Sequence, residues 1–428
     1  MKYNSQFERS PIKRIEKGMK KYRLGELIEV SRGASLKGDF YAASGKYIRL
    51  TCGNFDYRNN SFKENTSKDN LFYIGEFKAE FLLEKGDLIT PLTEQAIGLL
   101  GSTAWIPESG KYIQSQDIAK ITCKEELLDK KFAYYLISSN MVKQQLSAAA
   151  QQTKIRHTSP DKIKDCTVWL PSLAEQKQIG QLLFDIDRKI EINRTINHNL
   201  EAMAKQLYDY WFLQFDFPDE NGKSYKSSGG KMVWNEKLKR EIPEGWELTH
   251  LRDFINLEDN KRIPLSSKER SIRQGKYPYY GATGIMDRVD DYLFDDDRIL
   301  LAEDGSTSTP EGTPIIQYVW GKYWVNNHAH IIIPKDKENI LYIYQLLNRI
   351  PAKKIETGSI QKKISQENML GYRFALPPQA LIKAYCTIVT PLWEQYKQIT
   401  KQITSLTKLR NELLPLLMNG QALLQNCD

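Results

Sequence analysis

The sequence is poor in cysteine and has no long apolar run. Its five cysteines, at positions 52, 123, 166, 386 and 427 of 428 residues, include no pair at the spacing of a zinc or redox motif. A disulfide framework and a cysteine-based metal cluster are therefore excluded, and a cytoplasmic protein is predicted. No stretch of 18 apolar residues occurs, so no membrane-spanning helix is expected, and the basic N-terminus lacks the apolar segment of a signal peptide.

Common catalytic motifs are also missing. The chain has no P-loop, no dinucleotide-binding glycine fingerprint, no metalloprotease helix motif and no Asn-Pro-Pro-aromatic motif of amino-methylating DNA enzymes. Hydrophobic residues make up 41% of the chain, charged residues make up 27%, and the net charge is +8. This composition excludes global disorder, predicts about two to four domains, and permits a polyanionic partner.

An internal repeat runs along the chain. The matched segments are Leu88-Ile89 with Ile299-Leu300 and Gly110-Lys-Tyr112 with Gly321-Lys-Tyr323 at an offset of 211, Gln152-Thr-Lys-Ile155 with Gln361-Lys-Lys-Ile364 at 209, and Leu170-Pro171 with Leu376-Pro377 at 206. Their constant order predicts two copies of one module, each followed by a tail. Short β-branched and aromatic segments in each copy read as strands, and helix-spaced segments accompany them, so each module is predicted to be mixed α/β.

The two tails carry a seven-residue apolar repeat. In residues 172–212 one seam holds Ile179, Ile186, Asn193, Leu200 and Leu207, and a second holds Leu182, Lys189, Ile196, Met203 and Tyr210; the C-terminal tail repeats the pattern with Leu392, Ile399, Leu406 and Leu413. Core helices of two unrelated domains are one interpretation. Two long helices that pair with each other are the preferred one, with Asn193 fixing their register. Pro391 and Pro415 are expected to interrupt or kink the second helix.

Two groups of residues resemble metal sites. His328-Ala-His330 would place both rings on one face of a strand, but no third ligand is offered nearby, so structural histidines are favoured over a metal site. Asp161 followed by Glu175-Gln-Lys177 matches the string of a metal-dependent nuclease. Ser172 and Glu175 are better interpreted as a capping box at the start of a helix. No catalytic and no metal-binding residue is therefore assigned.

Cationic loops are the best candidates for binding chemistry. A polar, cationic segment precedes the first long helix, and a similar one lies at the equivalent place in the second copy. Arg and Lys can contact guanine edges or phosphates and Gln can pair with adenine, although solvated loops would look the same. The candidate DNA-binding residues are Arg32, Lys37, Gln152, Lys154 and Arg156 in the first module and Arg262, Arg270, Arg273, Gln361, Lys362 and Lys363 in the second.

Longer segments resemble one known family. The entry Leu170-Pro-Ser-Leu-Ala-Glu-Gln-Lys-Gln-Ile-Gly-Gln-Leu-Leu183 is similar to the start of the central helix in specificity subunits of type I restriction–modification systems. The stretch Ile190–Ala202 continues the similarity, and Leu413-Leu-Pro-Leu-Leu-Met-Asn-Gly420 resembles the end of that family. Tyr279-Tyr-Gly-Ala-Thr-Gly284, Ala302-Glu-Asp-Gly305 and Asn326-Asn-His-Ala-His330 are similar to its target-recognition domains.

The resemblance implies an α+β architecture and a function. Two mixed α/β target-recognition domains (1–171 and 213–377) would be joined in a pseudo-two-fold arrangement by two long antiparallel helices (172–212 and 378–428) that form a coiled coil. Such a chain is a non-catalytic reader of double-stranded DNA in which each recognition domain reads one half of a split, asymmetric target. The second helix departs from the family pattern at Leu376-Pro-Pro-Gln-Ala-Leu-Ile382 and at Pro391.

The resemblance also implies partners. Two methyltransferase subunits that carry S-adenosylmethionine would dock on the scaffold, and restriction subunits that use ATP for translocation, with magnesium for cleavage, would join them. No cofactor is expected in this chain, and no membrane partner. A metal-dependent nuclease and a coiled-coil scaffold that binds only protein are the alternatives from other functional classes.

Overall fold

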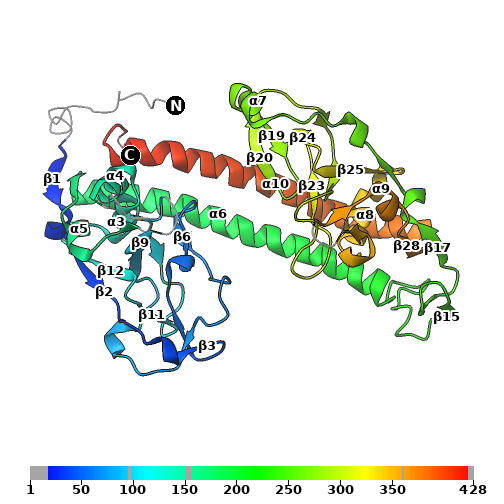
Figure 1. Ribbon diagram of the computed structural model, residues 1–428, viewed down its shortest axis with the longest axis horizontal. Coiled ribbons are helices and arrows are strands. Elements are labelled where there is room, and N and C mark those ends of the chain that lie inside the picture. The colour runs from blue at the N-terminus through cyan, green and yellow to red at the C-terminus, as the bar shows by residue number, and fades with distance from the viewer. Residues whose placement is uncertain (1–17, 95–97, 150–155, 359–360, 423–428) are drawn as a thin grey trace. The chain divides into compact units, whose positions relative to one another are not determined.

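The structure, a computed structural model, describes residues 18–94, 98–149, 156–358 and 361–422. The chain divides into two compact units, coloured along the sequence in Figure 1. Unit 1 comprises residues up to Asn193 together with those from Lys401 onward, and unit 2 comprises Arg194–Thr400. Both units are mixed α/β, as predicted. Among the described residues, no helix has the length and apolarity that crossing a membrane requires.

Unit 1 is built on two four-stranded sheets. The first has the order β10 (Ala104–Trp105), β8 (Leu88–Pro91), β12 (Ile118–Cys123), β2 (Ile28–Arg32), and the second has the order β11 (Tyr112–Ile113), β4 (Tyr47–Arg49), β7 (Phe72–Tyr73), β3 (Tyr41–Ala42). Short pairs join β1 (Lys20–Arg23) to β14 (Thr167–Leu170), β5 (Phe55–Asp56) to β6 (Ser61–Phe62), and β9 (Thr93–Glu94) to β13 (Arg156–His157). The helices are α2 (Leu24–Leu27), α3 (Lys130–Ile137), α4 (Asn140–Ala149) and α5 (Pro160–Lys164).

Unit 2 repeats this plan. Its first sheet has the order β18 (Ile255–Leu257), β25 (Ala329–Pro334), β22 (Arg298–Ala302), β23 (Ile316–Val319), and its second has the order β20 (Ile285–Val289), β19 (Gln274–Tyr280), β24 (Lys322–Val325), β21 (Phe294–Asp295). Short pairs join β15 (Met232–Asn235) to β16 (Arg240–Pro243), β17 (Glu247–His250) to β28 (Arg373–Leu376), and β26 (Glu356–Thr357) to β27 (Lys363–Ile364). The helices are α7 (Ser267–Ile272), α8 (Ile340–Leu347) and α9 (Gln366–Leu370).

The strand orders show that the repeat is structural. Strands β2, β12, β8 and β10 follow one another across the first sheet of unit 1 as β18, β25, β22 and β23 do in unit 2. In both units the second sheet contains a parallel pair, β4 with β11 and β19 with β24. The central strands β8 and β22 are buried along their whole length, which explains the apolar runs Leu88-Ile89 and Ile299–Ala302 within them. The predicted duplication is therefore confirmed. The structure adds the order of the strands, which the sequence did not predict.

The first long helix, α6, spans Leu173–Tyr208 and begins with the predicted capping box. The backbone N–H of Glu175 donates to the Ser172 hydroxyl at 3.3 Å, and the Ser172 N–H donates back to the Glu175 carboxylate at 3.0 Å. A π-helical turn at Asp209–Leu213 follows the helix. Tyr208, Trp211, Phe212 and Phe215 of the aromatic segment are buried in the core of unit 2.

The second long helix, α10, spans Gln379–Met418 without a break. Pro391 and Pro415 both lie within it, so the prediction that they interrupt the helix is wrong. A proline removes one N–H and crowds the preceding turn, at a cost of about 3 kcal/mol. Burial of the same helix offsets that cost, because Ile382, Tyr385, Val389 and Trp393 all enter the core of unit 2.

The spacing between successive buried positions on α6 alternates between four and three residues. The predicted seam residues Ile179, Ile186, Asn193 and Leu200 are buried, and Leu207 packs against the core of unit 2. The second seam is formed by Leu183, Ile190, Asn197, Ala204 and Trp211, one residue later than predicted, whereas Met203 and Tyr210 are exposed. On α10, Ile399 is buried, Leu392, Leu406 and Leu413 are half-buried, and Trp393 replaces Leu392 as the buried residue of its turn.

Polar contacts show that the helices pair antiparallel within each unit. In unit 1, Asn193 donates to the Gln402 side chain at 3.2 Å, and Arg410 pairs with Asp187 at 2.8 Å. In unit 2, Asn197 donates to the Thr400 hydroxyl at 2.8 Å, and the Tyr385 hydroxyl donates to the Ala204 carbonyl at 3.0 Å. Rising numbers on α6 meet falling numbers on α10 in both cases. The predicted antiparallel pair is thus confirmed in each unit.

Candidate nucleic-acid interface

In unit 1 a cation follows the edge strand of the first sheet. Arg32 ends β2, is exposed, and donates from Nε to the Gln116 carbonyl at 2.8 Å. Gly33 comes next because a Cβ there would lie 2.3 Å from the carbonyl oxygens of Gln114 and Ser115. This close approach of two backbone segments fixes the direction in which Arg32 leaves the sheet. Lys37 lies a short distance further along and is exposed.

Arg156 lies in the segment that returns toward the long helix. It pairs in β13 with Glu94 of β9, and its guanidinium lies 3.5 Å from the Glu94 carboxylate. Glu94 is buried, and its other oxygen accepts the backbone N–H groups of Gly98 and Leu99. A buried carboxylate therefore lies beside the guanidinium of a half-exposed arginine. The predicted residues Gln152 and Lys154 lie outside the described residues.

The equivalent segment of unit 2 presents its cations more openly. Lys362 and Lys363 are 52% and 55% exposed, and Gln361 beside them is also exposed. Lys363 lies 3.1 Å from the Glu303 carboxylate, and Lys362 lies 3.1 Å from that of Glu356. Each ammonium is thus tethered at one side and open to solvent at the other.

Three other predicted cations of unit 2 are engaged in the fold. Arg262 is only 14% exposed and donates to Glu303 at 2.7 Å and to the Ala329 carbonyl at 2.9 Å. Arg270 donates to the Leu265 carbonyl and to Asp287, and its guanidinium lies over the Tyr279 ring. Arg273 pairs with Asp290 at 2.9 Å and lies over Trp324. Arginines paired within the protein in this way hold loops in place, and Arg273 retains the most exposure of the three.

A carboxylate cluster around His330 was missed by sequence reasoning. Asp259, Glu303 and His330 bring one ligand-type atom each within 4.8 Å of one another, so the expectation that no third ligand lies nearby is wrong. The cluster is already neutralised by protein cations, because Arg262 contacts both carboxylates and Lys363 contacts Glu303. Burial alone would raise the pKa of both carboxyls, but hydrogen bonds from His330 to Asp259 and from Arg262 to Glu303 hold each pKa below its usual range.

The sequence contained a signal for part of this cluster. Glu94 and Glu303 are 209 residues apart, the same offset that relates Gln152 to Gln361. In both units the acid directly follows the central strand region and pairs with a cation of the returning segment. Asp259 could not be found this way, because it meets His330 only through the pairing of β18 with β25.

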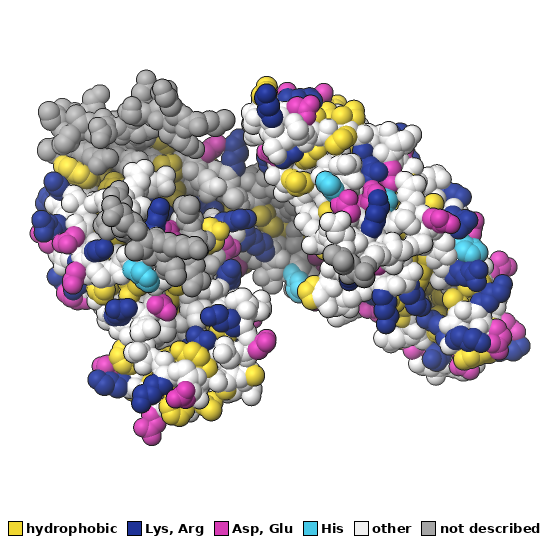
Figure 2. All heavy atoms as spheres, in the orientation of Figure 1, with side chains coloured by type: hydrophobic (Ala, Val, Ile, Leu, Met, Phe, Trp, Pro, Cys, Tyr) yellow, Lys and Arg dark blue, Asp and Glu magenta, His cyan; other side chains and the backbone are white. Residues whose placement is uncertain are grey.

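The face drawn in Figure 2 carries charges of both signs. On the face drawn in Figure 2, Lys and Arg side chains are interspersed with Asp and Glu side chains on both units. A uniform basic band would favour sequence-independent binding to phosphates. Dispersed cations on loops instead favour contacts made by individual side chains, which is the arrangement that base reading requires.

The nuclease string does not form a site. Glu175 is occupied in the capping box of α6, and Asp161 lies in the first turn of α5. A metal-dependent nuclease instead brings two carboxylates to one divalent ion. The duplicated module and the paired helices together define a protein of two similar units, each with cationic side chains near the end of its returning segment.

Comparison with known proteins identifies the family. The model of the "Type I restriction modification DNA specificity domain" matches residues 16–202 and 243–411. The chain belongs to this family: it is a non-catalytic DNA-recognition subunit with two recognition domains, and catalysis lies in other subunits.

Individual relatives agree with this assignment. The MjaIX specificity subunit of Methanocaldococcus jannaschii is 24% identical over 309 residues, 68% of each chain. The HindI specificity subunit of Haemophilus influenzae is 20% identical over 465 aligned positions, covering 94% of this chain and 99% of that one. A crystal structure of a type I restriction–modification S subunit from M. genitalium has a TM-score of 0.58 at 18% identity, covering 94% of this chain and 96% of that one, and so shares its fold.

Proposed function

We propose that unit 1 and unit 2 each read one half of a split, asymmetric duplex target. The observation that carries the proposal is the recurrence of one arrangement in both units: a largely buried glutamate after the central strands pairs with a cation of the returning segment. In unit 1 the pair is Glu94 with Arg156, and in unit 2 it is Glu303 with Lys363. Two equivalent presentations of positive charge suit two separate contacts with duplex DNA.

The candidate contacts differ in their expected importance. Arg32, Lys37 and Arg156 in unit 1 and Gln361, Lys362 and Lys363 in unit 2 have exposed or half-exposed side chains. Arg262 and Arg270 are expected to act mainly by holding the loops, since their donors are used inside the protein. Arg273 combines both properties, since it pairs with Asp290 and its side chain is 32% exposed.

Two methyltransferase subunits are the proposed partners. Met203 and Tyr210 of unit 2 are 52% and 40% exposed, and Leu409 and Leu416 of unit 1 are 44% and 38% exposed. The two pairs are related by 206 residues, the repeat offset of Leu170 and Leu376. Leu409 and Leu416 are seven apart on α10 and share one helix face, and Met203 of α6 and Tyr210 of the π-helical turn after it have the same spacing. Equivalent apolar pairs fit two copies of one partner.

In this proposal the cofactors belong to other chains. The methyltransferase subunits carry S-adenosylmethionine, and restriction subunits that use ATP and magnesium join the assembly to cleave DNA. This chain supplies the choice of sequence and the surface on which its partners assemble.

The test changes each reader separately. Duplex DNA randomised across both halves and the spacer is selected with the full chain, with the Arg32→Ala, Arg156→Ala double variant, and with the Lys362→Ala, Lys363→Ala double variant. Each double variant should weaken or relax one half-site only. A lost base contact should cost about 1–3 kcal/mol and change sequence preference, whereas a lost phosphate contact should weaken all sequences alike and reduce the salt dependence.

The outcomes separate the proposal from its alternatives. If both double variants perturb the same half-site, the two-reader model is wrong. A chain that binds methyltransferase but shows no salt-dependent binding to duplex DNA would be a protein-only scaffold. If both halves are read from one face of the duplex, their centres should lie about one helical turn apart.

A further inference from the structure

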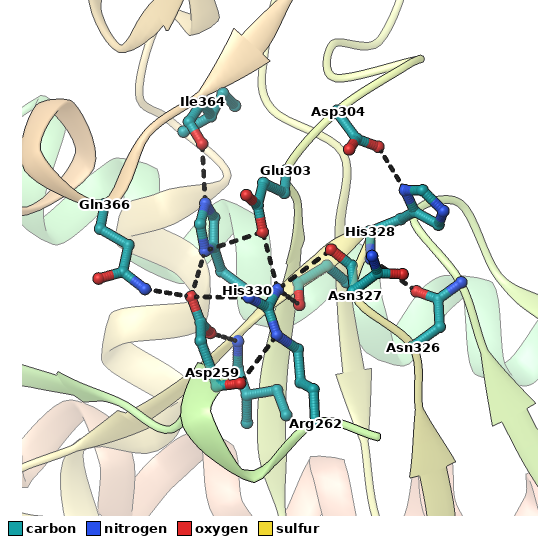
Figure 3. A network of polar contacts seen from close by, with 12 residues as sticks. Asp259, Arg262, Glu303, Asp304, Asn326, Asn327, His328, His330, Ile364 and Gln366 are labelled. Carbon is teal, nitrogen blue, oxygen red and sulfur yellow. Dashed lines mark hydrogen bonds and ion pairs between the residues drawn. The ribbon is translucent and has the colours of Figure 1, made fainter. Parts of the chain in front are cut away.

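His330 lies at the centre of the polar network drawn in Figure 3. It belongs to β25, and its side chain is 1% exposed. Its Nδ1 lies 2.6 Å from a carboxylate oxygen of Asp259, and its Nε2 lies 2.7 Å from the carbonyl oxygen of Ile364. Asp259 also accepts hydrogen bonds from the Ile331 backbone N–H and from the Gln366 side chain.

The contacts of His330 determine its protonation. Both ring nitrogens face acceptors that have no proton to give, and a neutral imidazole has only one N–H. In either neutral form, one nitrogen lone pair would point at a buried oxygen less than 3 Å away. The doubly protonated imidazolium satisfies both contacts.

The ring joins the returning segment to the sheet. Ile364 is fixed at both backbone groups, since its N–H donates to the Glu303 carbonyl at 2.9 Å and its carbonyl accepts from His330. Ile364 is fully buried, whereas Gln361, Lys362 and Lys363 directly before it are exposed. The backbone at Ile364 is therefore one anchor of this exposed polar segment, beside the pairing of Lys363 with Thr357 of β26.

We propose that His330, as an imidazolium, is a positioning residue for DNA recognition by unit 2: by anchoring Ile364 it sets how Lys362 and Lys363 are presented to one half-site. This inference rests on the proposed function of the two readers. It makes recognition of that half-site dependent on pH, because loss of the Nδ1 or Nε2 proton releases one of the two contacts.

The position of unit 1 that corresponds to His330 is an alanine. The repeat offset of 211 relates His330 to Ala119, and the strand registers agree, since His330 pairs with Leu301 and Ala119 pairs with Thr90. Ala119 is fully buried and has no titratable side chain. The half-site read by unit 1 is thus an internal reference for the one read by unit 2.

The sign of the pH effect follows from the charges around the ring. Burial would lower the pKa of His330, but the hydrogen bonds to Asp259 and Ile364 outweigh it and raise the pKa above 6.5. The charged groups that contact the ring are Asp259 and Glu303, and the cations Arg262 and Lys363 pair with Glu303 beside it. The anchor is complete below pH 6.5 and is lost as the pH rises through the raised pKa.

The experiment measures half-site preference against pH. The full chain, a His330→Gln variant and an Asp259→Asn variant are each selected on the randomised duplex library at constant ionic strength, from about pH 6 to about pH 9. The matched control is His250→Gln, a half-exposed histidine of the same unit on β17. Thermal unfolding of each variant monitors folding, and the Lys362→Ala, Lys363→Ala double variant identifies the half-site of unit 2.

The wild-type chain should lose preference at the unit 2 half-site by about tenfold or more as pH rises, the loss expected for one hydrogen bond to a charged group. His330→Gln should show the weakened preference at every pH, and Asp259→Asn should move the midpoint to lower pH. In all of these variants, preference at the unit 1 half-site should equal that of the wild type. His250→Gln should follow the wild type at both half-sites.

Contrary results are distinguishable. If both half-sites are read but the unit 2 profile is flat in pH, His330 is not a pH-dependent positioning residue and the two-reader function stands. If His330→Gln lowers thermal stability without altering half-site preference, the role is structural and the inference is overturned. If no half-site is read at any pH, the proposed function fails and the inference fails with it.

Discussion

At the scale of single residues, each candidate reader is built by pairing an exposed or half-exposed cation with a carboxylate that is largely buried. Glu94 and Glu303 are largely withdrawn from solvent, whereas Arg156 and Lys363 extend outward from them. A buried carboxylate loses little conformational entropy when it pairs, and it restricts the cation to a narrow range of directions. The acids therefore direct the cations that would contact DNA.

Arg262 and Lys362 should behave differently when each is replaced by alanine. Arg262→Ala leaves Glu303 and Asp259 without their guanidinium and should destabilise the chain by about 3 kcal/mol or more, because a buried charge loses its partner. Lys362→Ala should lower thermal stability much less, because Glu356 keeps its hydrogen bond from Thr307, and it should weaken DNA binding. Equal thermal stability of the two variants would contradict the distinction between holding and reading residues.

The carboxylates of the cluster also predict acid sensitivity. The pKa values of Asp259 and Glu303 are held below their ordinary values of 3.8 and 4.5, so their contribution to stability is full above pH 4.5 and is lost as the pH falls through the lowered values. Thermal unfolding measured against pH should show this loss, and Glu303→Gln should reduce it. An unchanged acid profile in Glu303→Gln would show that the network does not stabilise the fold.

The limits of prediction at this scale have a physical cause. Arg156 and Lys363 could be selected because they belong to a repeated segment. That Arg262 is consumed by four backbone and carboxylate acceptors could not be read from the sequence, because those acceptors come from three different segments. The partners of a cation are a tertiary property, whereas its identity is a local one.

At the scale of elements, the long helices show which part of a periodic pattern is reliable. The first seam, from Ile179 to Leu200, is buried as the heptad pattern indicates. The second seam lies at Leu183, Ile190 and Asn197 because the steps between buried positions alternate between four and three. Hydrophobicity alone favours Met203 as the seam residue. Ala204 is buried there instead, because closely packed helices favour a small side chain.

Leu200 and Met203 test the helix pair as matched positions one turn apart. Leu200 is 6% exposed and Met203 is 52% exposed. Leu200→Asp buries an unpaired carboxylate and should cost several kcal/mol in thermal or denaturant unfolding. Met203→Asp should leave unfolding unchanged but weaken association with a methyltransferase subunit, measured by co-purification or calorimetry.

Two results would contradict these expectations. If Leu200→Asp unfolds like the wild type, α6 and α10 do not stabilise each other. If Met203→Asp assembles normally, the exposed apolar pair on α6 is not part of the docking surface. Leu409→Asp is the equivalent variant in unit 1 and should reproduce the effect of Met203→Asp.

At the scale of the whole molecule, duplication was the most predictable property. Matching offsets in the sequence indicate two copies without any knowledge of the strands, because the copies keep the same order of segments. The arrangement of strands β2, β12, β8 and β10 was beyond reach, because β10 lies at the sheet edge while its sequence neighbours belong to other layers. Such pairing depends on contacts between distant segments.

The purified chain is predicted neither to cleave nor to methylate DNA. Plasmid incubated with the chain and magnesium should stay intact, because Glu175 is a helix cap and Asp161 belongs to a separate short helix. Ser172→Ala should cost about 1 kcal/mol of stability through the lost cap. Cleavage that disappears in a folded Glu175→Ala variant would revive the nuclease alternative.

The path of the chain has a consequence for inheritance. Unit 2 is one continuous stretch, Arg194–Thr400, whereas unit 1 is assembled from both sides of it. Leu417 and Met418, near the far end of the chain, are buried in the core that Leu24 and Leu27 help to form. A gene could therefore acquire a new unit 2 as a single exchanged segment with breakpoints inside the two helices. A single exchange upstream would replace only the N-terminal part of unit 1 and leave the original C-terminal helix in place. Residues from two different genes would then have to pack in one core.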